Sequence, residues 1–202
     1  MPPEAEIEAT MDRVGMAHIG IRPDALMRRA DVSIDLSAIA KGYGVDRIAE
    51  TLEAAGVTDY LVEIGGELRA SGTNERGTPW RIAIERPDVG ARVPYTTVDI
   101  RNAAIATSGD YRNYFEVDGE RYSHLIDPTT GRPVEHNLAS VTVVAPTCAE
   151  ADGLATAISV MGAKAGLAMA QEKELAVFVI IKGSEGFETR SSPAFQAYLK
   201  QG

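Results

Sequence analysis

Two uncharged segments in the C-terminal half of the chain restrict its fold most. Residues 139–145 (ASVTVVA) and 175–181 (LAVFVII) are apolar and rich in β-branched side chains, so both are predicted to be central strands of a buried sheet. The chain between them has helical spacing at residues 148–161 and 164–173. This order of strand, helices and strand favours a sheet covered by helices.

The rest of the chain predicts further strands around this centre. Strands are expected at residues 32–35, 60–64, 67–70, 80–85, 95–100, 103–107, 114–117, 121–125 and 187–190, with a hairpin turn at Asp118-Gly119. Helices are expected at residues 4–17 and 38–55, and residues 194–199 read as a strand or a helical turn. No repeat or linker interrupts the 202 residues. We therefore expect one α+β domain over residues 1–202, with a mostly antiparallel or mixed sheet packed against several helices.

Composition excludes several classes of partner. The net charge of −9 lacks the basic face that nucleic acid requires, so we expect no nucleic-acid partner. Cys148 is the single cysteine, which rules out an internal disulfide and a thiolate metal cluster. No run of 18 apolar residues predicts a transmembrane helix. The polar, acidic start is neither a signal peptide nor a lipid-attachment sequence.

The helix after Pro146 carries a candidate metal site. Thr147 and Glu150 form a T-x-x-E capping box. Asp152 and Thr156 are four residues apart, so their oxygens lie on one helix face, and a carboxylate with a hydroxyl suits Mg²⁺. The alternative is an Asp that stabilises the helix dipole and a Thr that bonds back to a carbonyl.

A lysine beside two glycines marks the start of another predicted helix. In residues 35–46 (DLSAIAKGYGVD), the two glycines each cost about 1 kcal/mol relative to alanine, which predicts close backbone approach to another element. Free amides at a helix start together with Lys41 suit phosphate, although the GxxxxGK[ST] pattern is missing. Asp35 is either a cap or a ligand acceptor. Gly56 is expected to end the helix.

Two pairs of small residues are weaker candidates for ligand contact. Gly65-Gly66 lets a backbone approach a flat ligand, or forms a strand bulge. Ser108 and Gly109 fall in a predicted loop after residues 103–107, which is compatible with phosphate or ring contacts. Neither a GxSxG nor a GxGxxG pattern occurs, which argues against a serine hydrolase and a Rossmann dinucleotide site.

His124 lies near the end of a strand-like run, just before the turn at residues 127–131 (DPTTG). At such a junction a histidine can act as a base or contact a ligand, or it can be a surface or packing residue. His18 and His136 lack metal-binding spacing, and we interpret them as surface residues.

Four segments in this order, residues 35–46, 63–72, 106–134 and 139–162, resemble the FAD:protein FMN transferase family, also called ApbE-like proteins. The resemblance covers most of the chain from about residue 12. It implies a Mg²⁺-assisted enzyme that moves FMN from FAD onto a threonine of an acceptor flavoprotein and releases AMP. Related members hydrolyse FAD to FMN and AMP, and a non-catalytic flavin-binding module is a third alternative.

The resemblance also implies roles for particular residues. Asp152, Thr156 and the backbone carbonyl of Ala38 correspond to metal ligands, and His124 corresponds to the general base that deprotonates the threonine. The expected flavin-binding residues are Asp35, Lys41, Gly65, Gly66, Ser108, Gly109 and Ile126.

The chain departs from the family pattern at its start. Family members usually carry a further N-terminal region with an export or lipoprotein signal and part of the flavin-binding surface, whereas this chain opens near the middle of the pattern. We expect either a trimmed form or a short variant, with the isoalloxazine side of the pocket incomplete if it is trimmed. The resemblance implies a periplasmic location or the outer face of the bacterial cytoplasmic membrane, with membrane contact only through an N-terminal anchor outside this chain.

Overall fold

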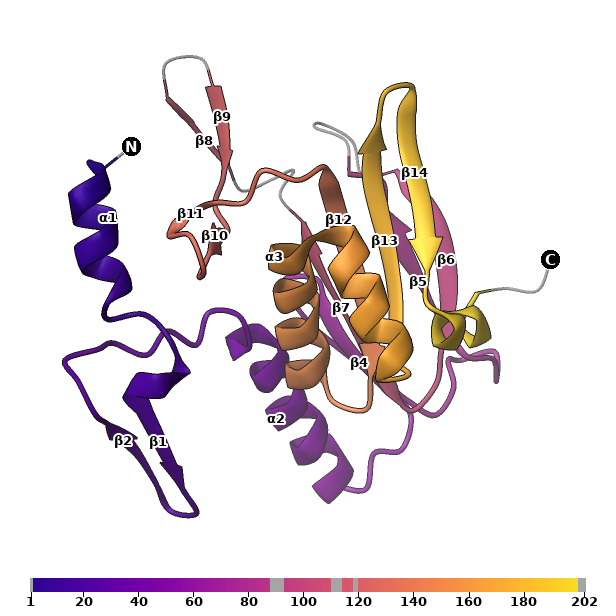
Figure 1. The fold of residues 1–202 in the computed structure, drawn as a ribbon. Helices are drawn as coiled ribbons and strands as arrows, with labels where there is room; N and C mark the ends of the chain where they lie inside the picture. Colours follow the sequence, from indigo (N-terminus) through magenta and orange to yellow (C-terminus); the bar gives the residue numbers. More distant parts are fainter. Residues whose placement is uncertain (1, 88–92, 110–113, 118–119, 200–202) are drawn as a thin grey trace.

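A six-stranded antiparallel sheet forms the centre of the molecule, in the strand order β14-β13-β12-β7-β4-β3 (Figure 1). The computed structural model describes residues 2–87, 93–109, 114–117 and 120–199. The strands are β3 (Tyr60–Ile64), β4 (Glu67–Ser71), β7 (Ala103–Gly109), β12 (Leu138–Ala145), β13 (Ala176–Gly183) and β14 (Gly186–Ser191). The expected α+β fold with a mostly antiparallel sheet is confirmed.

The two apolar segments are central strands, as predicted. β12 pairs antiparallel with both β13 and β7, and all of its residues are buried. A strand covered on both faces needs no alternation of polar and apolar side chains, because neither face meets water. This explains why both segments read as continuous apolar runs.

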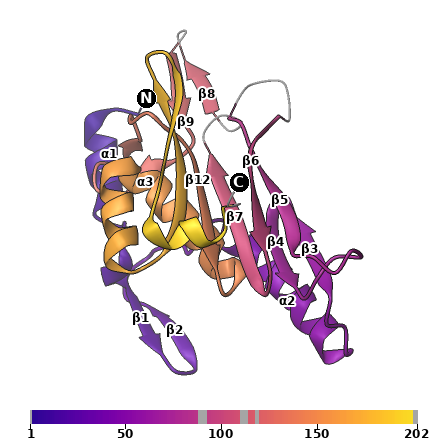
Figure 2. The ribbon, with the colours of Figure 1, turned by 90° about the vertical axis from the view of Figure 1, so that its right-hand side faces the viewer.

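Helices α2 (Ala40–Ala54) and α3 (Cys148–Glu172) cover one face of the sheet (Figure 2). α3 packs on β7 and β12, while α2 packs on β3, β4 and α3. α3 consists of two helical halves that meet at Gly162, where φ is +79°, so the two predicted helices are confirmed. Among the described residues, α3 is long and apolar enough to span a membrane, but a helix that covers a sheet has the same composition.

A hairpin and a short helix cover the opposite face. The hairpin is β5 (Trp80–Glu85) with β6 (Pro94–Ile100), and the short helix is η2 (Pro193–Ala197). Phe195 of η2 is fully buried and stacks on Phe178 of β13 with ring centroids 5.4 Å apart. The sheet is thus the middle of three layers.

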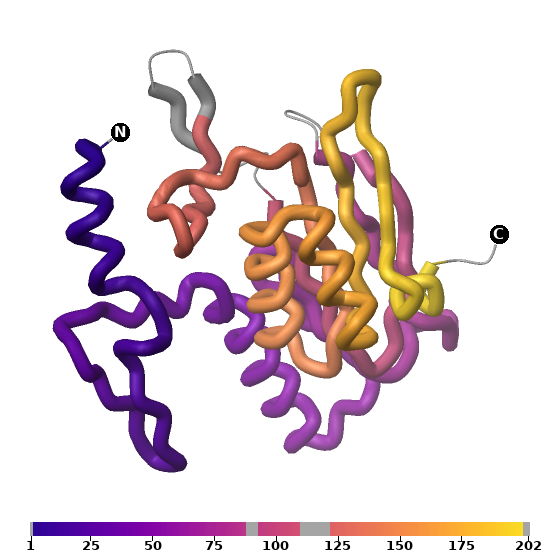
Figure 3. Tube along the Cα trace, in the orientation of Figure 1, coloured from indigo at the N-terminus to yellow at the C-terminus, as the bar shows by residue number. Residues whose placement is uncertain are grey.

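The N-terminal elements lie outside these layers (Figure 3). They are α1 (Glu4–Met11), η1 (Met16–His18) and the hairpin of β1 (Ile19–Arg22) with β2 (Ala25–Arg28). α1 packs against the turn of a second small hairpin, β10 (Ile126–Asp127) with β11 (Arg132–Pro133), through Ile7 and Met11 beside Gly131. Strands β8 (Tyr114–Val117) and β9 (Glu120–Ser123) pair antiparallel with each other. The predicted turn at Asp118-Gly119 lies outside the described residues.

Several sequence predictions in this region are wrong. Residues 32–35 form no strand, because no neighbouring strand pairs with them. The predicted helix at residues 4–17 stops at Met11, and the β1–β2 hairpin that follows was not predicted. α2 starts at Ala40 rather than at residue 38, because Ile39 has the non-helical angles φ −134° and ψ −8°. It ends as predicted at Gly56, where the amides of Gly56 and Val57 bond the carbonyls of Glu53 and Leu52.

His18 and His136, both interpreted as surface residues, are each partly buried, and His136 contacts the kink of α3. The His136 ring is partly buried against Gly162, and its Nε2 lies 3.3 Å from the carbonyl oxygen of Val160. The kink of α3 therefore packs against the His136 ring. Sequence spacing could not show it, because the contact depends on where the helix bends.

Substitution of Gly42 by alanine is expected to destabilise the protein by about 2 kcal/mol or more, because overpacking forces α2 away from α3. A Cβ at Gly42 would lie 2.3 Å from the Cys148 carbonyl oxygen. Urea unfolding measures the loss. Gly44→Ala is the matched control in the same helix, since its Cβ would meet only the end of the Ile64 side chain at 3.1 Å. Equal stability of the two variants would contradict the prediction.

Candidate functional site

The candidate site lies where the first turn of α2 crosses the first turns of α3. Gly42 lies against the backbone of Cys148 and Ala149, and Gly153 lies against the side chain of Ile39. The close approach predicted from the glycines at the start of α2 is therefore confirmed. It brings the residues before α2 next to the face of α3 that carries Asp152.

The Asp152 side chain accepts a hydrogen bond from a backbone amide of α2 that a regular helix would satisfy internally. Asp152 is only 2% exposed, and its Oδ2 accepts a hydrogen bond from the Gly42 amide at 3.0 Å. In a regular helix that amide would donate to the carbonyl of Ala38. No backbone amide in the described part of the chain donates to the Ala38 carbonyl, so this oxygen keeps its acceptor capacity at the junction.

Lys41 lies between two buried carboxylates. Its Nζ is 2.9 Å from Glu67 Oε1 and 3.6 Å from Asp152 Oδ1. Partial burial opposes the charge, but the hydrogen bond and charge of Glu67, with the charge of Asp152, raise the pKa of Lys41 above its usual value. We call Lys41, Glu67 and Asp152 the Lys41 cluster. Its two carboxylates keep the lysine positively charged at the helix junction.

Glu67 is a member of this site that sequence analysis missed. It is 3% exposed, and burial raises its pKa against the opposing effect of Lys41. Its Oε2 is buried and has no hydrogen-bond partner among the described residues. The available signal was an acidic residue directly after Gly65-Gly66, but its burial follows only from the sheet.

Gly65 and Gly66 form the turn that places Glu67. Their φ angles are +63° and +104°, and they connect β3 to β4 as a two-residue hairpin turn rather than a bulge. A Cβ at Gly65 would lie 3.4 Å from Lys41 Cδ. The turn therefore packs beside the lysine stem and starts β4 at the Lys41 cluster.

Ser108 and Thr156 meet across the sheet and α3. Their hydroxyl oxygens are 3.1 Å apart and share a hydrogen bond. Ser108 and Gly109 belong to β7 rather than to the predicted loop, because they pair with Val141 and Ser140 of β12. Thr156 lies one turn beyond Asp152, so this pair continues the polar line of α3.

Asp35, His124 and Ile126 lie at the outside of the molecule. The Asp35 carboxylate accepts hydrogen bonds from the Ser37 hydroxyl and amide, which lower its pKa, so it caps the turn before α2. Ile126 is 47% exposed on β10, which lies next to α3. His124 is exposed in the segment between β9 and β10. The structure thus gathers Lys41, Asp152, Thr156 and Ser108 and leaves these three peripheral.

The metal ligands expected from the sequence are oxygens of three chemical kinds. They are the Asp152 carboxylate, the Thr156 hydroxyl and the Ala38 carbonyl. Within the described ranges no group of three or more His, Cys, Asp or Glu side chains could hold a metal. An oxygen-only set with few protein ligands fits Mg²⁺ or Mn²⁺, which keep several waters or substrate phosphates, and lacks the nitrogen and sulfur ligands that suit Zn²⁺ or Cu²⁺.

Cys148 is expected to be unreactive in the folded protein. It is fully buried at the start of α3, and burial, with the nearby charge of Asp46, raises its pKa to about 12. A thiol–disulfide reagent at pH 8 should label no cysteine in the native protein and one in denaturant. Rapid native labelling would contradict this and would mean that α3 separates from α2.

The fold and the junction define a class of protein: an α+β domain that holds a lysine beside a buried carboxylate where two helices cross. The ApbE family model matches residues 1–179. This chain belongs to the ApbE family.

Named relatives agree with this assignment. A FAD:protein FMN transferase from Vibrio cholerae is 46% identical over 202 residues, which is all of this chain and 60% of that protein. The one from Haemophilus influenzae is 51% identical over 82% of this chain and 48% of its own length. The crystal structure of the Pseudomonas stutzeri flavinyl transferase ApbE, apo form, has a TM-score of 0.88 and 44% identity, covering 100% of this chain and 63% of that one. The chain thus spans less than two thirds of each of these relatives.

Proposed function

We propose that this chain is a catalytic part of a FAD:protein FMN transferase, which moves FMN from FAD to a threonine of an acceptor flavoprotein and releases AMP. The observation that carries the proposal is the helix junction itself, where Lys41 Nζ lies 3.6 Å from Oδ1 of the buried Asp152 and the Ser108–Thr156 pair follows one helical turn further along α3. The names of the relatives support the transfer of FMN from FAD to a protein.

In this proposal the helix junction binds the pyrophosphate of FAD. Lys41 supplies a fixed positive charge, which an acidic protein needs to hold an anionic substrate. Asp152, Thr156 and the Ala38 carbonyl would hold Mg²⁺. When bound, Mg²⁺ neutralises the pyrophosphate and stabilises the charge that develops on the leaving phosphate. Gly65, Gly66 and Gly109 leave room for the substrate beside these groups, and Asp35 and Ile126 contact the flavin nucleotide at the rim.

His124 acts as the general base. It accepts the proton of the threonine hydroxyl while the hydroxyl oxygen attacks the FMN-side phosphorus. A phosphoester bond forms, the bond from that phosphorus to the bridging oxygen breaks, and AMP leaves. Exposure of His124 allows a second protein to present its threonine there. Water in place of threonine would give FMN and AMP.

We propose that the protein acts in the periplasm or on the outer face of the bacterial cytoplasmic membrane. The resemblance to exported family members supports this location. Secretion of a reporter fused to the complete open reading frame would test it, and retention in the cytoplasm would contradict it.

A coupled assay tests the reaction. The protein is incubated with FAD, Mg²⁺ and a threonine-containing acceptor domain, and AMP release and acceptor mass are followed together. AMP with a mass gain equal to FMN is the expected result, and an acceptor with valine in place of its threonine is the control. AMP with free FMN would instead identify a hydrolase, and tight FAD binding without AMP would identify a binding module.

A further inference from the structure

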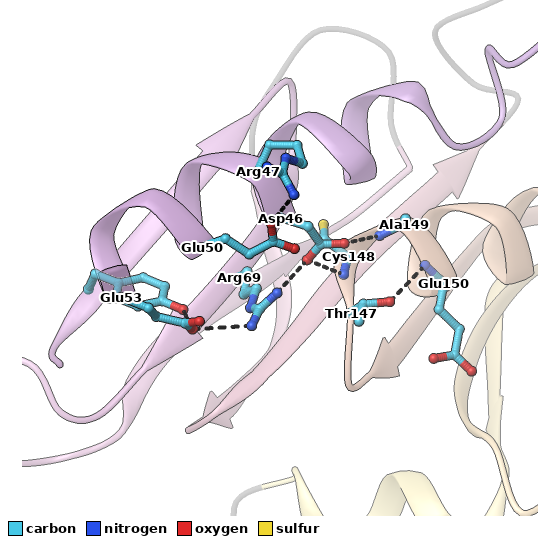
Figure 4. Close-up of polar contacts among 10 residues, drawn as sticks. Asp46, Arg47, Glu50, Glu53, Arg69, Thr147, Cys148, Ala149 and Glu150 are labelled. Atoms are coloured by element: carbon cyan, nitrogen blue, oxygen red, sulfur yellow. Dashed lines mark hydrogen bonds and ion pairs between the residues drawn. The ribbon is translucent and has the colours of Figure 1, made fainter. Parts of the chain in front are cut away.

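A second buried carboxylate, that of Asp46 in α2, connects α2 to α3 (Figure 4). It is 6% exposed. Its Oδ1 accepts from the Cys148 amide and from Arg69 Nη1, both at 2.9 Å, and its Oδ2 accepts from the Ala149 amide at 2.9 Å. Figure 4 shows the carboxylate directed at the start of α3. A residue 102 positions earlier in the chain therefore caps this helix.

Arg69 extends this connection into the sheet. From β4 its Nη1 bonds Asp46, and its Nη2 lies 3.2 Å from Glu53 Oε1 (Figure 4). The same Glu53 oxygen accepts a hydrogen bond from the Tyr60 hydroxyl of β3. The start of α3 is thus held by one network that includes α2 and both strands of the β3–β4 hairpin.

The helices hold each other reciprocally. Asp46 of α2 accepts two amides from the first turn of α3, and Asp152 of α3 accepts the Gly42 amide from the first turn of α2. A displacement of the first turn of α3 moves Asp152 with it, because Asp152 follows Ala149 by less than one helical turn. The position of the proposed metal donors therefore depends on Asp46.

We propose that Asp46 and Arg69 are positioning residues that hold α3 against α2, so that Asp152 and Thr156 converge with the Ala38 carbonyl on one cation. This inference rests on the proposed function. Asp46 acts through the helices rather than on substrate, because it is buried and three protein donors already occupy its two oxygens.

The variant Asp46→Asn tests the inference. It keeps the shape of the side chain but turns one oxygen into an NH₂ group that faces an N–H donor. Mn²⁺ replaces Mg²⁺ as the probe, and free Mn²⁺ is measured by electron paramagnetic resonance with FAD present and a protein-free blank. We expect the affinity for Mn²⁺ to fall about tenfold, as for other residues that orient metal ligands. The Mg²⁺ concentration that gives half-maximal FMN transfer should rise by the same factor. At saturating Mg²⁺ the transfer rate of the variant should largely return to the wild-type rate.

Ser192→Ala is the matched control. Ser192 is buried, its hydroxyl accepts from the Val177 amide at 2.9 Å and donates to the Leu175 carbonyl at 2.6 Å, and it takes no part in the junction. It should lower the thermal midpoint without changing Mn²⁺ affinity. Arg69→Lys is the second variant, for use if Asp46→Asn does not fold. It keeps the positive charge but loses the double contact with Asp46 and Glu53. It should therefore also weaken Mn²⁺ binding.

The outcomes separate the two proposals. Unchanged Mn²⁺ affinity in the folded Asp46 or Arg69 variant would overturn the positioning role and leave the proposed function untouched. An equal loss in Ser192→Ala would also overturn it, because the effect would then follow stability alone. Normal Mn²⁺ binding by the wild-type chain without FMN transfer would contradict only the proposed function.

Discussion

Replacement of Asp152 by alanine is expected to lower the rate of FMN transfer by about 10²-fold or more and to abolish its dependence on Mg²⁺. The carboxylate is the only charged group among the three proposed metal donors, and loss of one electrostatic contact to a developing charge costs about 10²–10³ in rate. AMP release over a Mg²⁺ titration measures both effects. Full activity in chelator-treated buffer would refute the metal assignment.

Loss of stability must be separated from loss of metal in this variant. Asp152→Ala leaves the Gly42 amide without its acceptor and removes one carboxylate from Lys41, which costs about 1–3 kcal/mol. Asp152→Asn is the matched control, because its side-chain oxygen still accepts from Gly42 while the charge is gone. We expect Asp152→Asn to be more stable than Asp152→Ala in urea and still to transfer FMN poorly.

Replacement of His124 by alanine is expected to reduce transfer to a threonine acceptor by about 10²–10⁴-fold, the range for loss of a general base. FAD binding should stay near the wild-type level, because His124 is exposed and lies in the β9–β10 segment, outside the Lys41 cluster. Single-turnover transfer and fluorescence titration with FAD measure the two quantities separately.

The histidine and aspartate variants should differ in their response to metal. His124→Ala should keep wild-type Mn²⁺ affinity, whereas Asp152→Ala should lose it. Partial rescue of His124→Ala by added imidazole would support the base role. Transfer at the wild-type rate in His124→Ala would remove His124 from the mechanism.

Local pattern was sufficient for much of the fold. The apolar runs of β12 and β13 identified the centre of the sheet, and the Thr147 hydroxyl does accept the Glu150 amide at 3.3 Å. The break between two helices near residue 162 was visible as a gap in helical spacing and is the kink at Gly162. These features depend on residues close together in sequence, where propensity and capping act.

Where neighbours in space decide the outcome, sequence analysis failed. Residues 32–35 have the composition of a strand but find no strand to pair with, and β1 and β2 pair with each other outside the main sheet. His136 carries no sign in its surroundings that the bend of α3 would cover it. Strand pairing and helix bending bring in distant segments, so local periodicity cannot specify them.

The candidate site divides in the same way. The sequence alone predicted that Asp152 and Thr156 share a helix face and that Lys41 lies at a helix start. It also predicted a close backbone approach at Gly42. Only the tertiary structure brought Glu67 to Lys41 across 26 positions, Ser108 to Thr156 across 48, and Asp46 to the first turn of α3. The physical reason is that these contacts depend on how two helices and a hairpin pack on one sheet. That geometry arises from the whole core rather than from any single segment.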